Sequence, residues 1–223
     1  MLYKAGKEDV DVSCFLVDIT FWLYTMIIMQ LTPRLNEAIK LSSHLHRHQT
    51  RRDEYHTPYV SHLYSVAALL SSVTDDEDII IAGLMHDSLE DVPHYSYDDL
   101  VRDCGERVAS IVSHVTEPLD ANKEESDQIP WLERKESYLK VLKEGGVESA
   151  MVSAADKVHN TESFISDTAK EGEAFSSRFA SSLRNKIWFH EQALAIIREK
   201  IGEEHPLVIR LALCTEEFKQ LAN

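Results

Sequence analysis

Apolar residues recur at spacings of three and four along most of the chain, and no segment shows a convincing strand-like alternation. This pattern predicts an all-α protein. The expected helices have an apolar face and capping or breaking residues at their ends. Two of them begin at Thr32-Pro33 and at Thr57-Pro58, and a third runs from 75–78 to about 92. The others cover about 96–105, 131–144, 147–168, 177–200 and 206–221. The polar segment 117–130 is expected to be a loop.

The domain organisation follows from the absence of an interior linker in the 223 residues. We expect a single domain over residues 29–223 and an N-terminal extension over residues 1–28. Residues 12–29 are largely apolar and near the length of a membrane span, but Asp18 in their middle is costly in a bilayer. The segment also lacks the features of a signal peptide. We therefore expect a packed extra helix, a dispensable extension or a misassigned start before Met29, and no stable membrane association.

The net charge and the cysteine content limit the kinds of molecule that the chain can be expected to bind and the setting in which it is expected to function. The chain has 38 acidic against 23 basic residues and a net charge of −15, which would repel a long nucleic acid. A small anionic substrate stays compatible with this balance if cations, including a metal ion, gather at one site. Cys14, Cys104 and Cys214 form no CxxC pair, which excludes a disulfide framework and favours a reducing, cytoplasmic setting. Nothing in the sequence indicates an oligomeric state.

The expected helix ending near residue 92 carries an unusual group of polar residues. At about 100° per residue, His86, Asp87, Glu90 and Asp91 share one arc of about 140°. The opposite side of the helix is apolar. An ordinary solvent-facing helix end is the simpler explanation, but acidic groups at a helix C-terminus are opposed by the helix dipole. Charged groups in such a helix are typically paired or bound to a metal.

Two further polar residues interrupt apolar helix faces elsewhere. His62 lies on the core side of its expected helix, and Asp156 interrupts a run of small and apolar residues, with Asn160 one turn later. A lone histidine of this kind is usually a core residue. Together with His86 and Asp87, however, these residues would form a site of two nitrogen and two oxygen ligands. Such a site suits Mn²⁺, Fe²⁺, Co²⁺ or Zn²⁺ better than Mg²⁺, and Mn²⁺ is the first choice.

Three segments in this order are similar to the HD phosphohydrolase superfamily, and more narrowly to the hydrolase domain of RelA/SpoT homologues. They are RRDEYHTPYVSH (51–62), GLMHDSLEDV (83–92) and AADKVHN (154–160). The resemblance covers about residues 35–200 and is greatest to small, stand-alone alarmone hydrolases. It implies an all-helical HD fold of about eight or more helices around a metal site. It also implies hydrolysis of ppGpp or pppGpp to GDP or GTP and pyrophosphate.

The resemblance also implies roles for individual residues. The expected metal ligands are His62, His86, Asp87 and Asp156. The acidic pair beside the metal, Glu90 and Asp91, would handle the attacking water and its protons. The expected substrate-binding residues are Arg51, Arg52, Asn160, Arg184 and Trp188, although ordinary surface arginines and a core tryptophan are the alternatives. Lys157 belongs to the third motif by position, but a surface charge would explain it equally well.

The chain also departs from the family pattern. Leu63, Val92 and Ser153 replace a proline, a threonine and a lysine of the usual motifs, and these changes bear on the substrate more than on the metal site. Two alternatives therefore stay open. One is an HD hydrolase of another nucleotide, such as an NADPH 2′-phosphatase or a nucleotidase. The other, which the retained ligands and acidic pair disfavour, is a non-catalytic nucleotide sensor.

Overall fold

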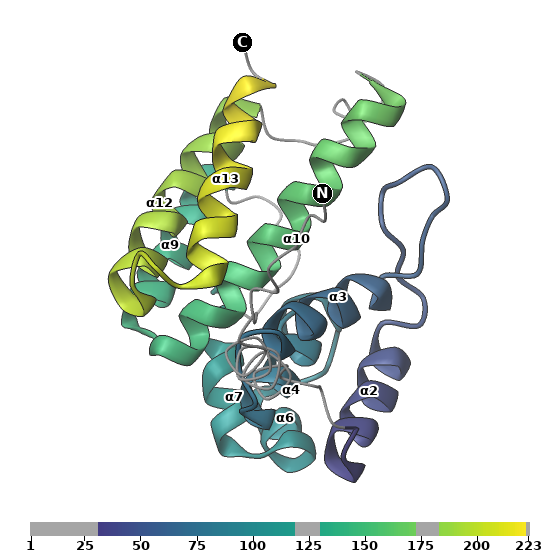
Figure 1. Cartoon of the computed structure of the whole chain (residues 1–223). Coiled ribbons are helices and arrows are strands. Elements are labelled where there is room, and N and C mark those ends of the chain that lie inside the picture. Colours follow the sequence, from purple (N-terminus) through teal and green to yellow (C-terminus); the bar gives the residue numbers. More distant parts are fainter. Residues whose placement is uncertain (1–30, 119–129, 173–182, 222–223) are drawn as a thin grey trace, which may run out of the picture.

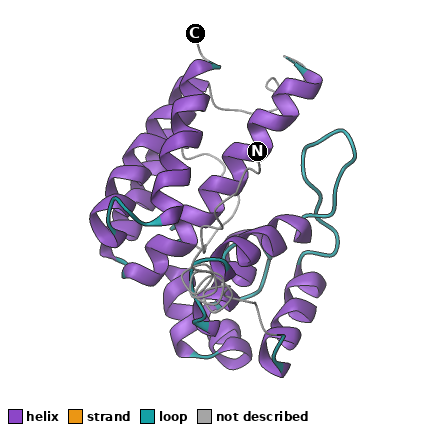
Figure 2. Ribbon diagram, in the orientation of Figure 1, coloured by secondary structure: helices purple, strands orange, loops and turns teal. Residues whose placement is uncertain are grey.

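The computed structural model describes residues 31–118, 130–172 and 183–221, and within them the regular structure is helical (Figure 2). The all-α prediction is therefore confirmed. The described helices are α2 (Pro33–Leu45), α3 (Val60–Ser71), α4 (Glu77–Met85), α5 (Ser88–Asp91), α6 (Tyr97–Cys104), α7 (Glu106–Ser113), α9 (Trp131–Glu144), α10 (Val147–Glu171), α12 (Leu183–Ile201) and α13 (Pro206–Gln220).

The long helix α10 joins two groups of helices (Figure 1). It packs against α3 and α4 on one side and against α12 and α13 on the other. Helix α4 is the most deeply placed element, because every residue from Ile79 to Met85 is buried. A helix that is apolar on all sides is stable only when neighbours surround it, and α2, α3, α7 and α10 surround α4. The elements that carry the three motifs therefore meet at the centre of the molecule.

Several predicted helix ends are confirmed by their capping interactions. The Thr32 hydroxyl accepts a hydrogen bond of 3.0 Å from the backbone N–H of Leu35 at the start of α2. Ser96 and Asp99 form the expected capping box at the start of α6. Gly105 ends that helix with φ of 94°, a conformation that glycine adopts without steric cost. Local chemistry thus determines these boundaries.

Two expectations about the helices are wrong in detail, and one helix was not expected. The helix expected to run to about residue 92 is broken at His86 and Asp87, between α4 and α5. Helix α3 begins at Val60 rather than at Thr57-Pro58, because the Thr57 hydroxyl donates to Asp53 and caps no helix. Helix α7 was not predicted, although it packs against α4 and α6. Its amphipathic pattern is only two turns long, which limits the periodic signal.

The segment between α2 and α3 projects from the body of the molecule as a long loop (Figure 1). An isolated antiparallel bridge between Thr50 and Pro58 closes it. The backbone N–H of Arg51 donates to the Thr57 carbonyl at 2.7 Å, and that of Tyr59 donates to the Gln49 carbonyl at 2.9 Å. These bonds hold the base of the loop against the start of α3. The loop thereby brings Arg51 to α10, where Arg51 Nη2 donates a hydrogen bond of 3.0 Å to Asn160 Oδ1.

Some predictions fall on residues that the structure does not describe. They are the extension 1–28, the apolar run 12–29, most of the loop 117–130, Cys14 and the expected helical residues 177–182. Among the described helices, none has the length and apolarity to cross a bilayer.

Candidate metal centre and adjoining groove

Three elements bring the four predicted metal ligands to one point. His62 lies in the first turn of α3, Asp156 lies in the middle of α10, and His86 and Asp87 form the break between α4 and α5. The two histidines are buried, with exposed fractions of 0% and 4%. The two carboxyl groups are partly buried, with side-chain exposed fractions of 18% each. The site therefore has buried nitrogen atoms on its inner side and carboxylate oxygens toward the pocket.

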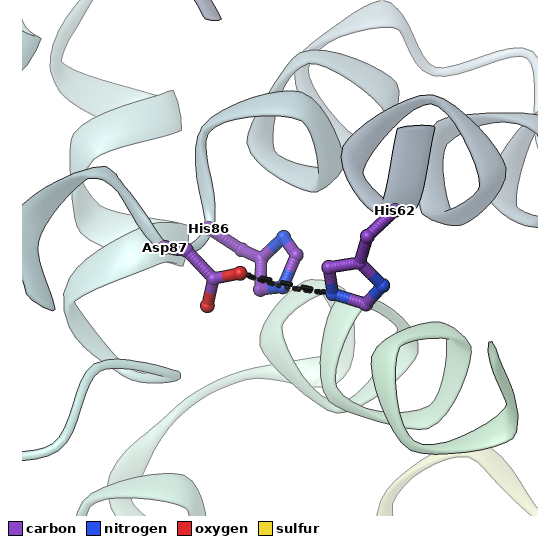
Figure 3. Close-up of side chains that lie close together, drawn as sticks. All are labelled: His62, His86 and Asp87. Atoms are coloured by element: carbon purple, nitrogen blue, oxygen red, sulfur yellow. Dashed lines mark hydrogen bonds and ion pairs between the residues drawn. The ribbon is translucent and has the colours of Figure 1, made fainter. Parts of the chain in front are cut away.

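The distances between the ligand atoms are those of a compact polar cluster. The Nε2 atoms of His62 and His86 are 3.3 Å apart. Asp156 Oδ1 lies 3.2 Å from His62 Nε2 and 3.6 Å from His86 Nε2. Asp87 Oδ2 lies 3.1 Å from His86 Nε2 and 3.7 Å from His62 Nε2. Figure 3 shows the side chains of His62, His86 and Asp87 converging, and one ligand atom from each of these three lies within 4.8 Å of the others.

The surrounding hydrogen bonds orient these side chains as a metal site requires. His86 Nδ1 lies 2.8 Å from the carbonyl oxygen of Gly83, which can only accept. The Nδ1 hydrogen is therefore on that side, and Nε2 faces the cluster, where it could bind a metal ion once deprotonated. His62 Nδ1 is likewise occupied, by His159 Nδ1 at 2.8 Å. The donor set and the outer hydrogen bonds both fit a divalent metal ion.

Each carboxylate also receives a hydrogen bond from outside the cluster. The Tyr59 hydroxyl donates to Asp87 Oδ2 at 2.6 Å, and Asn160 Nδ2 donates to Asp156 Oδ1 at 2.5 Å. Burial opposes ionisation of Asp156, but the positive charge of Lys157 and hydrogen bonds from both histidines hold the pKa of Asp156 well below its usual range. Burial likewise opposes ionisation of Asp87, whose pKa is nevertheless lowered by the attraction of His86. Both groups are therefore carboxylates at neutral pH.

Glu90 and Asp91 lie on the wall of the pocket that His86, Asp87 and Asp156 also line, a cavity of about 200 Å³. Burial, together with repulsion from Glu117 and Asp87, raises the pKa of Glu90 to about 8. The backbone N–H of Glu117 donates to Glu90 Oε2 at 3.3 Å. This raised pKa makes Glu90 a candidate proton donor in the pocket.

A larger groove of about 680 Å³ adjoins this pocket. The two cavities share wall residues, among them Tyr59, Lys135 and Asn160, and therefore lie next to each other. The groove also contains Arg51 and Arg52 from the long loop. An acidic protein thus presents a concentration of basic side chains beside its metal site, which favours an anionic ligand.

The predicted substrate-binding residues divide into two groups. Arg51 and Arg52 line the groove, and Asn160 lies at its junction with the pocket, where it accepts a hydrogen bond of 3.0 Å from Arg51 Nη2. Arg184 is exposed and Trp188 packs against the main hydrophobic core, and neither lines the two cavities. The geometry thus does not bring these last two residues to the site, because α12 turns a different face toward the groove.

Several residues of the site were not identified from the sequence. Glu117 is buried with an exposed fraction of 3% and forms an ion pair with Lys135. Lys157 is buried and not a surface charge, and its Nζ donates to the Tyr138 hydroxyl at 2.8 Å. Lys157 could have been identified from the sequence, because it lies within the motif 154–160. The contacts of Glu117, Lys135 and Tyr138 could not, because they depend on how segments distant in the sequence pack together.

Comparisons with known proteins agree with this geometry. The family model described as "HD domain" matches residues 38–183. Guanosine-3′,5′-bis(diphosphate) 3′-pyrophosphohydrolase MESH1 of Mus musculus is 31% identical over 129 residues, which cover 57% of this chain and 67% of that protein. The enzyme of the same name from Drosophila melanogaster is 29% identical over 126 residues, covering 56% of this chain and 65% of the relative.

Two solved structures have a similar fold. The structure of a metazoan orthologue of SpoT, described as hydrolysing ppGpp, matches with a TM-score of 0.65 and 21% identity, covering 88% of this chain and 99% of that one. A protein from Listeria monocytogenes EGD-e matches with a TM-score of 0.60 and 25% identity, covering 71% and 99%. The family match spans well over half of the chain, and the fold agrees with it. The chain therefore belongs to the HD-domain family.

Proposed function

We propose that this protein is a metal-dependent (p)ppGpp 3′-pyrophosphohydrolase, which converts the guanosine alarmone and water to GDP or GTP and pyrophosphate. The observation that carries the proposal is the cluster of two histidines and two aspartates beside a groove with several basic residues. The names of the MESH1 relatives support the choice of substrate. A small phosphorylated nucleotide also matches an acidic protein whose basic residues gather in one groove.

The proposed metal ligands are His62 Nε2, His86 Nε2, Asp87 Oδ2 and Asp156 Oδ1. Their mixed nitrogen and oxygen character supports Mn²⁺ as the resident ion, with Fe²⁺, Co²⁺ and Zn²⁺ as alternatives. When bound, such an ion lowers the pKa of water and stabilises negative charge on phosphoryl oxygens. The residues themselves supply the fixed geometry, because the outer hydrogen bonds of each ligand limit its rotation.

Glu90 and Asp91 have separate parts in this proposal. Glu90 is the proton donor to the departing 3′ oxygen, because its raised pKa keeps a proton available at neutral pH. Asp91 orients the attacking water from the same wall of the pocket. Arg51, Arg52 and Asn160 bind the substrate along the groove, where the arginines offset its negative charge.

The organisation of the chain is part of the proposal. A single HD hydrolase domain would occupy residues 29–223, with residues 1–28 as an extension. The cysteine content supports a cytoplasmic setting, and Cys104 and Cys214 are both free and buried.

The deciding experiment is Mn²⁺-dependent release of pyrophosphate from ppGpp by the purified protein, with Asp87→Ala as the control. Pyrophosphate and GDP should appear only with metal and with Asp87 intact. Metal binding without turnover of ppGpp would contradict the proposed substrate. Turnover of NADPH or a nucleoside monophosphate would then identify the protein as an HD hydrolase of another nucleotide, and no turnover at all would favour a sensor.

A further inference from the structure

The end of helix α5, which carries the acidic pair, is held by a side chain from a distant part of the chain. Helix α5 has four residues and ends at Asp91. A helix of this length is unstable alone, and the carbonyl groups of its last turn have no partner within the helix. Gln49, 42 residues earlier in the loop between α2 and α3, supplies one: its Nε2 donates a hydrogen bond of 2.8 Å to the Asp91 carbonyl oxygen.

The orientation of the Gln49 amide is determined by its two partners. A carbonyl oxygen can only accept, so the Gln49 atom that faces Asp91 is the nitrogen. Gln49 Oε1 therefore faces His46, whose Nδ1 lies 2.6 Å away and carries a hydrogen. His46 is buried, with an exposed fraction of 1%, and its ring stacks on Tyr59. A flipped amide would set its oxygen against the Asp91 carbonyl, so only one orientation satisfies both contacts.

The main chain around this contact is fixed as well. The Gln49 N–H donates to the His46 carbonyl at 3.0 Å, and the Gln49 carbonyl accepts from the Tyr59 N–H at 2.9 Å. Gln49 thus connects the end of α2, the start of α3 and the end of α5. The Asp91 N–H donates to the Asp87 carbonyl at 2.8 Å. The peptide groups on both sides of the Asp91 side chain are therefore held, which limits the directions that its carboxyl group can take.

We propose that Gln49 is a positioning residue, which caps α5 and thereby keeps the Asp91 carboxyl group where it can orient the attacking water. Gln49 lies outside the pocket and the groove, so its effect on turnover runs through Asp91 and not through contact with a ligand. The inference rests on the proposed function, in which Asp91 has this part. It also makes the base of the long loop a support for the acidic pair.

The test is a double-mutant cycle between the two residues, with turnover of ppGpp as the readout. Gln49→Glu keeps the acceptor that faces His46 and replaces the donor to Asp91 with a second acceptor. It should lower kcat roughly tenfold, the factor expected when a hydrogen bond is lost and a carbonyl loses its partner. KM and the Kd for Mn²⁺ should change less than about twofold, because neither ligand contacts Gln49. In an Asp91→Asn background the same substitution should change kcat less than about twofold.

Two further variants guard the interpretation. Gln49→Met is neutral and of similar size, and it should lower kcat as Gln49→Glu does, which would exclude the added charge as the cause. Gln192→Glu, at an exposed glutamine of α12 outside both cavities, is the matched control and should behave as the wild type. Equal losses of kcat with and without Asp91 would indicate a general structural effect and overturn the inference. So would an unchanged kcat in both Gln49 variants.

Hydrogen exchange separates this inference from the proposed reaction. In the metal-loaded full chain, Gln49→Glu should accelerate exchange of the Asp91 backbone amide about tenfold, because α5 opens more readily without its cap. The amide of Leu211 in α13 should exchange as in the wild type. If the wild type does not hydrolyse ppGpp, the proposed function fails, and exchange alone decides whether Gln49 holds Asp91. Unchanged exchange at Asp91 would overturn the inference.

Discussion

Replacing Tyr59 with phenylalanine would remove a single hydroxyl group from the outer side of the proposed metal site. This hydroxyl donates a hydrogen bond of 2.6 Å to Asp87 Oδ2. Burial, and then the charge of Asp87, raise the pKa of Tyr59 well above its usual range, so the phenol stays protonated and donates. The ring itself stacks on His46, with centroids 5.5 Å apart, and meets the edge of His62 at 5.6 Å. Phenylalanine retains both ring contacts.

The expected magnitude follows from the loss of this one bond. A hydrogen bond to a charged group contributes about 1.5–3 kcal/mol, which corresponds to roughly tenfold to hundredfold in an equilibrium constant. Loss of an outer hydrogen bond to a metal ligand typically costs a similar factor in metal affinity. We therefore expect Tyr59→Phe to raise the Kd for Mn²⁺ by about tenfold to hundredfold. Saturating metal should restore much of the turnover.

The assay is calorimetric or competitive titration of the metal-free protein with Mn²⁺, accompanied by thermal unfolding in the presence of a chelator. Tyr64→Phe is the matched control, because Tyr64 lies on the same helix and its hydroxyl contacts Ser43, away from the cluster. The control should bind the metal as the wild type does. Unchanged affinity in Tyr59→Phe would refute the argument that this hydroxyl holds Asp87 in place. Equal losses in both variants would indicate a general effect on α3.

Three further predictions concern the roles, the charge and the packing of the site. Asp156→Ala should lose Mn²⁺ binding and turnover together, whereas Glu90→Gln should bind Mn²⁺ normally and lose about 10²–10⁴-fold in kcat; full turnover by either variant would remove the assigned role. Because the pKa of Glu90 is raised to about 8, its proton is present below that pH and is lost above it. Turnover should therefore fall as pH rises through about 8, and the same fall in Glu90→Gln would assign the titration to another group. Gly83→Ala should lower the free energy of unfolding in urea by about 1–3 kcal/mol, because the added Cβ would overlap Leu70 Cδ1 between α3 and α4, and an unchanged midpoint would contradict this packing argument.

The parts of the fold that could be predicted from sequence are those with a strong local cause. The start of α2 and the capping box of α6 depend on hydrogen bonds within three residues, and both were identified from residue type and spacing. The start of α3 was misplaced because the Thr57 hydroxyl has a competing partner, Asp53, in the loop before it. Side-chain competition of this kind requires the loop conformation to be known.

The residues of the candidate site differ in the same way, because some had a local signal in the sequence and others depend on packing. His62 and Asp156 were conspicuous because each interrupts an apolar helix face, and the motif resemblance linked them to His86 and Asp87. Trp188 was also a candidate, but packing turns Lys186 and Phe189 of α12 toward the groove instead. The rotation of a helix about its axis is determined by its partners, so helical spacing groups residues on a face without showing which face meets the ligand.

The interruption between α4 and α5 explains how a dipeptide as common as His-Asp could form the proposed metal site. On an uninterrupted helix, adjacent side chains diverge by about 100° and cannot both reach one ion. At Asp87 the backbone has φ of −93° and ψ of 0°, which departs from the values of a regular α-helix, and Asp87 Oδ2 comes within 3.1 Å of His86 Nε2. Transferring the two residues to a straight helix of another protein would therefore not transfer metal binding. A designed copy of this site would have to include the end of α4 and the turn after it. A search for related sites should use that backbone geometry as its criterion, because the His-Asp dipeptide alone is too common to identify them.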